Sequence, residues 1–279
     1  MASPDTSERP EAAAPPPAGA PLLAAAGLCY AYGGSSALRG VSLSVAEGEI
    51  LTVTGPRGSG KTTLLRCLNG SLLPEKGEVT FAGLAVHTLP PRDRERLRRD
   101  RFGWVGTEPA LVPELTAWEN AALPLLLAGA SSREARRTAL EWLERLDVAA
   151  CARKRPAALP QSERQRVAVA RALVHRPQVL FADEPDAPLH SADRAQVLRA
   201  LTTAARTHGV TVVLASLDAA VLRADATEDA AEDGAARPGH ALADRTLTLL
   251  DGRPVPPGAA SARSATPHRE DGAACSLSV

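Results

Sequence analysis

Hydrophobic and polar positions along the chain follow two periods in turn, one of two residues and one of three to four residues. Between residues 41 and 45, valine and leucine alternate with serine, which predicts a half-buried strand. Other strand-like segments are short and mainly apolar, and lie at residues 50–54, 78–81, 178–182, 210–215 and 246–250. The continuous apolar runs 178–182 and 210–215 are suited to strands buried in a parallel sheet.

Segments whose apolar residues have helical spacing lie between these strands. Leu64 and Leu68 share one face of a predicted helix, and residues 165–174 form another strong helical pattern. Ser131 followed by Glu134 has the pattern of a capping box, which starts a helix. Strands that alternate with helices predict an α/β domain with a mostly parallel core sheet.

Composition changes at both ends of the chain and at one internal segment. Residues 1–22 are rich in proline and alanine and are expected to form a disordered leader, and residues 256–279 a disordered tail. Residues 224–243 are acidic and rich in alanine, and we interpret them as a surface loop insertion. The ordered domain is therefore expected to span residues 23–255.

Overall charge and cysteine usage exclude several classes of protein. Lys plus Arg and Asp plus Glu both number 32, so nothing in the balance indicates a nucleic-acid or anionic-membrane partner. The 4 cysteines are far apart, which disfavours a zinc site or a disulfide framework. We find neither a signal peptide nor an apolar run of about 18 residues, so if the protein works at a membrane, another chain must supply the spanning helices.

Residues 55–63 carry the strongest chemical motif, because they fit G-x-x-x-x-G-K-[ST] between a predicted strand and a predicted helix. Glycines let successive N–H groups point at an anion, which the following helix also favours through its dipole. Lys61 is expected to reach the β- and γ-phosphates, and the Thr62 hydroxyl to bind Mg²⁺. The predicted site for ATP with Mg²⁺ consists of Gly55, Pro56, Arg57, Gly58, Ser59, Gly60, Lys61, Thr62 and Thr63.

A phosphate-binding loop of this kind needs an acidic partner at the end of a neighbouring strand. The apolar run that ends at Ala182 is followed by Asp183 and Glu184. Asp183 is expected to hold Mg²⁺ through water, and Glu184 to orient or deprotonate an attacking water as the catalytic residue. Without the loop, the same residues would equally suit a strand that ends in acids at the surface.

Three further segments carry recognisable patterns: LRGVSL at 38–43, ELTAWEN at 114–120 and QRVAVARAL at 165–173. With the loop and the acidic pair, they make the chain resemble an ABC-type ATPase, the nucleotide-binding subunit of an ATP-binding-cassette transporter. The resemblance covers about residues 25–254. Together with Leu-Pro-Leu at 123–125, the segment 114–120 is similar to that of the lipoprotein-releasing and macrolide-exporter-like group.

The resemblance implies a P-loop fold with an N-terminal antiparallel β part and an α-helical subdomain at about residues 92–160. Tyr32, placed before the first strand, is expected to stack on adenine; the alternative is a half-buried strand tyrosine. The implied partners are an integral membrane permease, docked near residues 107–118, and a second ATP-binding subunit. The implied location is cytoplasmic, on the inner face of the membrane through the permease.

Four departures from the family pattern concern dimer closure and hydrolysis. Thr107 stands where the family has a glutamine, and Leu217 where it has the switch histidine. The LSGGQ signature is replaced by Leu-Pro-Gln-Ser-Glu at 159–163, and the D-loop aspartate by His190. Proline has no N–H and leucine no donor, so hydrolysis is expected to be impaired.

Three functions remain open: a subunit that hydrolyses ATP to drive a permease, a non-hydrolysing partner or regulatory subunit, and a soluble ABC protein. The last is disfavoured because the chain has neither a second cassette nor a long coiled-coil insert. His190 could also be a displaced switch histidine, although a surface histidine fits its motif better. The run RDRERLRRDR at 92–101 fits a solvated helix face better than a nucleic-acid patch.

Overall fold

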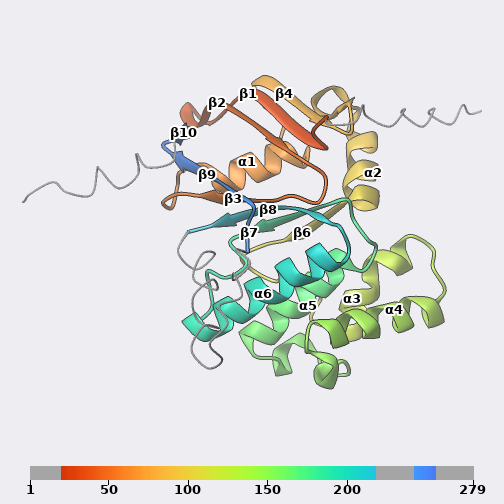
Figure 1. Ribbon diagram of the computed structural model, residues 1–279. Coiled ribbons are helices and arrows are strands. Elements are labelled where there is room, and N and C mark those ends of the chain that lie inside the picture. The colour runs from red at the N-terminus through yellow and green to blue at the C-terminus, as the bar shows by residue number, and fades with distance from the viewer. Residues whose placement is uncertain (1–19, 218–241, 256–279) are drawn as a thin grey trace, which may run out of the picture.

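Two β-sheets and a layer of helices make up the described part of the chain (Figure 1). The computed structural model describes residues 20–217 and 242–255. The predicted leader, acidic insertion and tail therefore lie mostly or wholly outside the described residues. At their edges, Leu22 is buried and Ala243 packs against the core beneath the larger sheet.

The larger sheet has six strands in the order β10-β9-β3-β8-β7-β6. Their bounds are β3 Ile50–Thr54, β6 Phe102–Val105, β7 Val179–Asp183, β8 Thr211–Ser216, β9 Arg245–Leu250 and β10 Arg253–Val255. Neighbours from β9 to β6 pair in parallel, whereas β10 forms an antiparallel hairpin with β9. Thr54 pairs with Ser216 and Asp183 with Ala215, so the carboxyl ends of β3, β8 and β7 meet at one edge.

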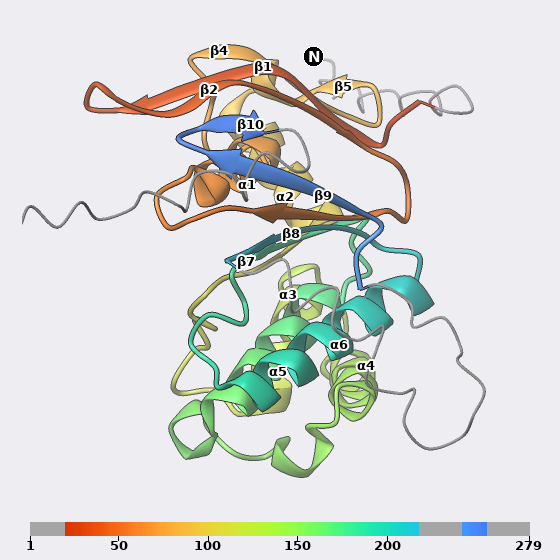
Figure 2. The same ribbon diagram turned by 60° about the vertical axis from the view of Figure 1, so that its left-hand side comes forward.

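The smaller sheet is antiparallel and has the order β2-β1-β4-β5. Its strands are β1 Leu23–Tyr32, β2 Ser35–Val45, β4 Lys76–Phe81 and β5 Leu84–Ala85. Helix α1 (Lys61–Leu68) lies between this sheet and the larger one (Figure 2). Its buried leucines fill the space between the two sheets.

The remaining helices mostly cover the other face of the larger sheet (Figure 2). They are α3 Ala117–Leu127, α4 Ser132–Arg145, α5 Gln161–Leu173 and α6 Ser191–Thr207, with short 3₁₀ turns at Val86–Thr88, Ala149–Cys151 and Pro156–Ala158. Helix α2 (Pro91–Arg101) precedes β6, and its side chains are all exposed or half-buried. Within the described ranges, no helix combines the length and apolar character needed to cross a membrane.

Alternation along the buried strands divides the hydrophobic interior into two cores. On β7, Leu180 and Ala182 face the helical layer, whereas Val179 and Phe181 face α1 and the antiparallel sheet. Both faces of a parallel strand are apolar because both are covered, which is why these segments read as continuous apolar runs.

The predicted α/β class with a mostly parallel core sheet is confirmed, as are the strands predicted at 50–54 and 246–250. Ser131 caps α4 by accepting a hydrogen bond from the Glu134 N–H at 3.3 Å. The run at 92–101 is a solvated helix, as expected.

Two expectations about the fold were wrong in detail. Tyr32 does not precede the first strand but is the last residue of β1. The range 92–160 is not purely helical, because β6 pairs with β7 inside the larger sheet. The sequence of β6 is only four residues long and includes a glycine, so its pattern is too short to indicate a strand. Pairing with β7 makes the segment a strand.

Phe181 is fully buried and meets Phe102 edge to face, with ring centroids 5.3 Å apart. Phe181→Ala is expected to lower the free energy of unfolding by about 3–5 kcal/mol, because it removes apolar contacts and leaves a cavity. Leu127→Ala, at a side chain that is 72% exposed, should change it by less than about 0.5 kcal/mol. Urea denaturation of both variants measures the difference, and equal losses would contradict the assignment of the core.

Candidate functional site

The loop between β3 and α1 follows a path that glycine alone permits at two positions. Gly55 and Gly60 have φ values of 148° and 101°. A Cβ atom on Gly55 would lie 2.2 Å from the Leu249 carbonyl oxygen, and one on Gly60 would lie 2.4 Å from that of Ala37. The loop is therefore pressed against β9 and β2, and its position follows from both sheets.

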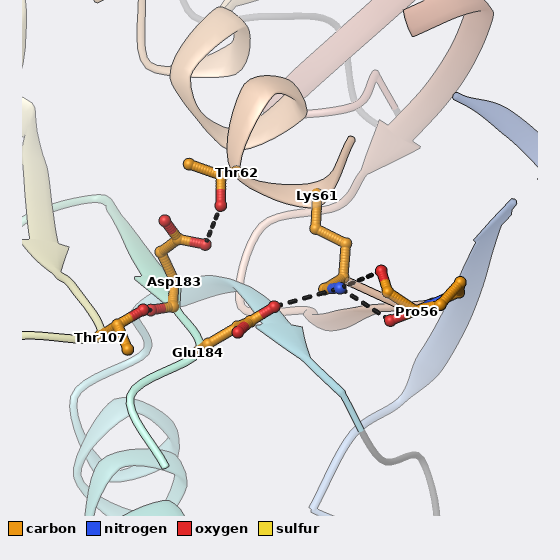
Figure 3. A network of polar contacts seen from close by, with 7 residues as sticks. Pro56, Lys61, Thr62, Thr107, Asp183 and Glu184 are labelled. Carbon is orange, nitrogen blue, oxygen red and sulfur yellow. Dashed lines mark hydrogen bonds and ion pairs between the residues drawn. The ribbon is translucent and has the colours of Figure 1, made fainter. Parts of the chain in front are cut away.

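Lys61, the first residue of α1, points back into this loop (Figure 3). Its Nζ donates to the carbonyl oxygens of Gly55 at 2.7 Å and Pro56 at 3.0 Å. The same atom lies 3.1 Å from Oε1 of Glu184, and the lysine side chain is only 3% exposed. The Lys61 ammonium group is thus held beside the loop by these oxygen partners, although the side chain that carries it is flexible.

Thr62 and Asp183 form the second contact between α1 and the acidic strand end. The Thr62 hydroxyl donates to Oδ1 of Asp183 at 2.9 Å (Figure 3). Burial raises the pKa of Asp183, the Thr62 hydrogen bond opposes that rise, and the charge of Glu184 adds to it. A buried carboxylate whose pKa is raised in this way is stabilised by a cation beside it or by protonation.

Glu184 sits just beyond the end of β7 in a left-handed backbone conformation, with φ of 48°. Its N–H donates to the Ala215 carbonyl of β8 at 3.0 Å, which continues the sheet pairing by one residue. Such a conformation is strained for a glutamate, and it turns the carboxylate out of the strand toward Lys61.

These residues fit a phosphate and a divalent cation. The buried Ser59 hydroxyl has no hydrogen-bond partner among the described residues, although buried polar groups normally have one. Gly60 is the N-cap of helix α1 and offers no side-chain cap, so the first N–H groups of the helix are available to an anion. Hydroxyl and carboxylate oxygens, as on Thr62 and Asp183, are the ligands that Mg²⁺ prefers.

The other predicted residues lie around this centre. Pro56, Arg57 and Gly58 are exposed on the outer side of the loop, whereas Thr63 is buried in the first turn of α1. Tyr32 is 48% exposed and meets Tyr30 edge to face, with centroids 4.8 Å apart.

The β1–β2 hairpin brings these tyrosines toward the loop. Tyr30 pairs with Leu38, and the adjacent Ala37 carbonyl is the group that touches Gly60. The sequence analysis missed Tyr30, although two tyrosines spaced two residues apart on a strand share one face.

Two of the unusual motif residues lie beside the Lys61–Asp183 centre. Thr107 donates through its hydroxyl to the Asp183 carbonyl oxygen at 3.0 Å (Figure 3). Leu217 follows β8 directly and is 38% exposed.

The other two stand at helix starts. Pro160 is the N-cap of α5, and Ser162 in its first turn is buried. His190 is exposed at the N-cap of α6, which fits the surface histidine predicted for it.

Comparison with known proteins places the chain in a family. The model of the ABC transporter family matches residues 38–187. The chain is 42% identical over 179 residues to the lipoprotein-releasing system ATP-binding protein LolD 2 of Caulobacter vibrioides, covering 64% of this chain and 78% of that protein. It is 30% identical over 226 residues to LolD of Bacteroides fragilis, covering 81% and 96%.

A solved structure supports the same assignment. The dimeric ATP-binding cassette MJ0796, in a post-hydrolysis state bound to ADP and Pi, superposes with a TM-score of 0.70 at 30% identity, covering 84% of this chain and 97% of that one. The fold and the loop are therefore those of an ATP-binding cassette. The chain belongs to the ABC transporter family as an ATP-binding subunit similar to the lipoprotein-releasing group, which confirms the predicted resemblance.

Two glycines of the loop provide a matched test of its packing. Gly60→Ala places a Cβ atom against the Ala37 carbonyl, whereas Gly58→Ala, also at positive φ, meets open space. Gly58→Ala should cost about 1–2 kcal/mol of stability from backbone strain, and Gly60→Ala about 1–3 kcal/mol more from overlap. Denaturant unfolding without nucleotide measures both, and equal costs would show that the loop does not press on β2.

Proposed function

We propose that this chain binds Mg²⁺ and ATP at the loop of residues 55–63 and couples that binding to a membrane permease. The observation that carries the proposal is the convergence of Lys61, Thr62, Asp183 and Glu184 at the open start of α1. Two elements far apart in the sequence contribute to this convergence, since Lys61 and Thr62 begin α1, and Asp183 and Glu184 lie at the end of β7.

Each residue has a separate role in the proposal. Lys61 would exchange its loop carbonyl partners for phosphate oxygens, and the N–H groups of the loop would bind the same anion. Thr62 directly, and Asp183 through water, would hold Mg²⁺, which supplies positive charge against the phosphates. Tyr32 would stack on the base, since its ring is exposed at the end of β1.

Glu184 is the proposed base or orienting group for the attacking water. In the structure its carboxylate is paired with Lys61 at 3.1 Å. Phosphate binding by Lys61 would release the carboxylate from that ion pair, so the two roles are compatible.

The proposed partners are an integral membrane permease and a second ATP-binding subunit. LolD proteins are named for a lipoprotein-releasing system, and the MJ0796 cassette is a dimer. By analogy, this chain would dock on its permease near residues 107–118, on the cytoplasmic face of the membrane.

A second candidate function is a non-hydrolysing partner or regulatory subunit. It is favoured by the start of α5, where Pro160 lacks an N–H, Ser162 is buried and Glu163 adds negative charge to the first turn. That helix end is poorly suited to a phosphate bound by the opposite subunit. Leu217 likewise offers no donor at the chain's own site.

Lys61→Ala should weaken ATP binding about 10-fold or more, because it removes a charge-assisted contact to the phosphates. Lys76→Ala, at an exposed lysine on β4, should leave the affinity unchanged. Equilibrium titration of the full chain with a fluorescent ATP analogue compares them. Equal affinities for wild type and Lys61→Ala would refute the proposed phosphate site.

The purified protein should release phosphate from ATP slowly or not at all. One missing preorganised donor typically lowers the rate about 10²–10³-fold, although several such losses do not simply multiply. Steady-state phosphate release is the measurement, with Glu184→Gln as the blank. Robust turnover that Glu184→Gln abolishes would show that another residue replaces the donor missing at Leu217, and would exclude the non-hydrolysing alternative.

A further inference from the structure

The segment that connects β6 to α3 is held by hydrogen bonds from side chains of neighbouring elements. Its first two residues make the contacts nearest the site. Gln165 of α5 donates through Nε2 to the Gly106 carbonyl oxygen at 2.8 Å, and the Thr107 hydroxyl donates to the Asp183 carbonyl oxygen at 3.0 Å. The start of the segment is thus held between α5 and the end of β7.

Further along, two other side chains bind its backbone. Arg171 of α5 donates to the carbonyl oxygens of Pro109 at 2.8 Å and Ala110 at 2.9 Å. The fully buried Asn120 of α3 accepts from the Val112 N–H at 2.7 Å and donates to the Val112 carbonyl oxygen at 3.1 Å. Carbonyl groups held by the buried Asn120 and the half-buried Arg171 have little freedom of movement, so we expect a fixed connection.

The Thr107 hydroxyl acts where sheet pairing stops. Strands β6 and β7 pair in register up to Val105 and Ala182, one residue before Asp183. Beyond that point the chain turns away, and the Thr107 side chain supplies the donor to the Asp183 carbonyl. A β-branched residue has few χ1 rotamers, so this hydroxyl is held in place more firmly than a longer side chain would be.

We propose that Thr107 is a positioning residue for Asp183. It fixes the backbone from which the Asp183 carboxylate reaches Thr62, and Gln165 holds the loop in which Thr107 lies. The inference rests on the proposed function, because Asp183 is there assigned to Mg²⁺. The residue that departs from the family pattern at this position thereby prepares the cation side of the site before nucleotide arrives.

The test compares three variants of the full chain. Thr107→Val removes the hydroxyl at constant shape, Thr107→Ser keeps it, and Thr88→Val removes an equivalent bond, from the Thr88 hydroxyl to the Ala85 carbonyl at 2.9 Å, on the surface. Hydrogen–deuterium exchange of residues 103–112 is followed without nucleotide. ATP affinity is measured with Mg²⁺ and with EDTA. The dissociation constant in EDTA divided by that with Mg²⁺ reports the contribution of the cation.

Thr107→Val should speed exchange in residues 103–112 and weaken ATP binding about 2- to 10-fold with Mg²⁺, as expected for one hydrogen bond. Its affinity in EDTA should match wild type, because the phosphate loop is untouched. Thr107→Ser and Thr88→Val should both keep the wild-type ratio. A purely structural loss would instead weaken binding equally with Mg²⁺ and with EDTA, and that result overturns the proposal.

Gln165→Leu provides a second route if Thr107→Val does not fold. It removes the other anchor of the loop and should also speed exchange and lower the Mg²⁺-dependent ratio. Unchanged exchange and an unchanged ratio in both variants would overturn the proposal. If wild type binds ATP with EDTA but gains nothing from Mg²⁺, positioning of Asp183 for a cation is wrong while the phosphate site stands. If it binds no ATP at all, the proposed function itself has failed.

Discussion

Parallel pairing of β3, β8 and β7 is the constraint on which the site depends, because it places their carboxyl ends at one edge. The loop leaves β3 there, and Asp183 and Glu184 end β7 there. Strands buried on both faces can hold this register only while both faces are covered. The two hydrophobic cores, one around α1 and one under α3 to α6, therefore hold in place the strand ends that carry these residues.

Close packing around glycine links the smaller sheet to the same edge. Gly60 rests on the Ala37 carbonyl of β2, and Gly55 on the Leu249 carbonyl of β9. The β1–β2 hairpin therefore packs against the loop through its backbone, and Tyr32 at the end of β1 remains exposed. The two sheets are held in a fixed relation at the loop because these backbone contacts leave no room for a side chain.

The altered motif residues divide into two groups by position. Thr107 and Leu217 lie at the chain's own site, whereas Pro160 lies at the start of α5, away from the Lys61–Asp183 centre. Thr107 donates a hydrogen bond to the backbone carbonyl of Asp183, whereas Leu217 is partly exposed. Thr107 thus contributes a contact to the acidic strand end, whereas Leu217 carries no side-chain donor.

Sequence by itself determined the strands at 50–54 and 178–182, the glycine loop and the acidic pair, because hydrophobic period and motif spacing are local properties. It also determined the family. Tertiary structure alone decided that Phe102–Val105 is a strand, that Tyr32 ends β1, and that Lys61 pairs with Glu184. It decided equally that Thr107 bonds to Asp183, 76 residues away. These features depend on contacts between segments far apart in the chain, and no local pattern of residues encodes which distant carbonyl or carboxylate a side chain will meet.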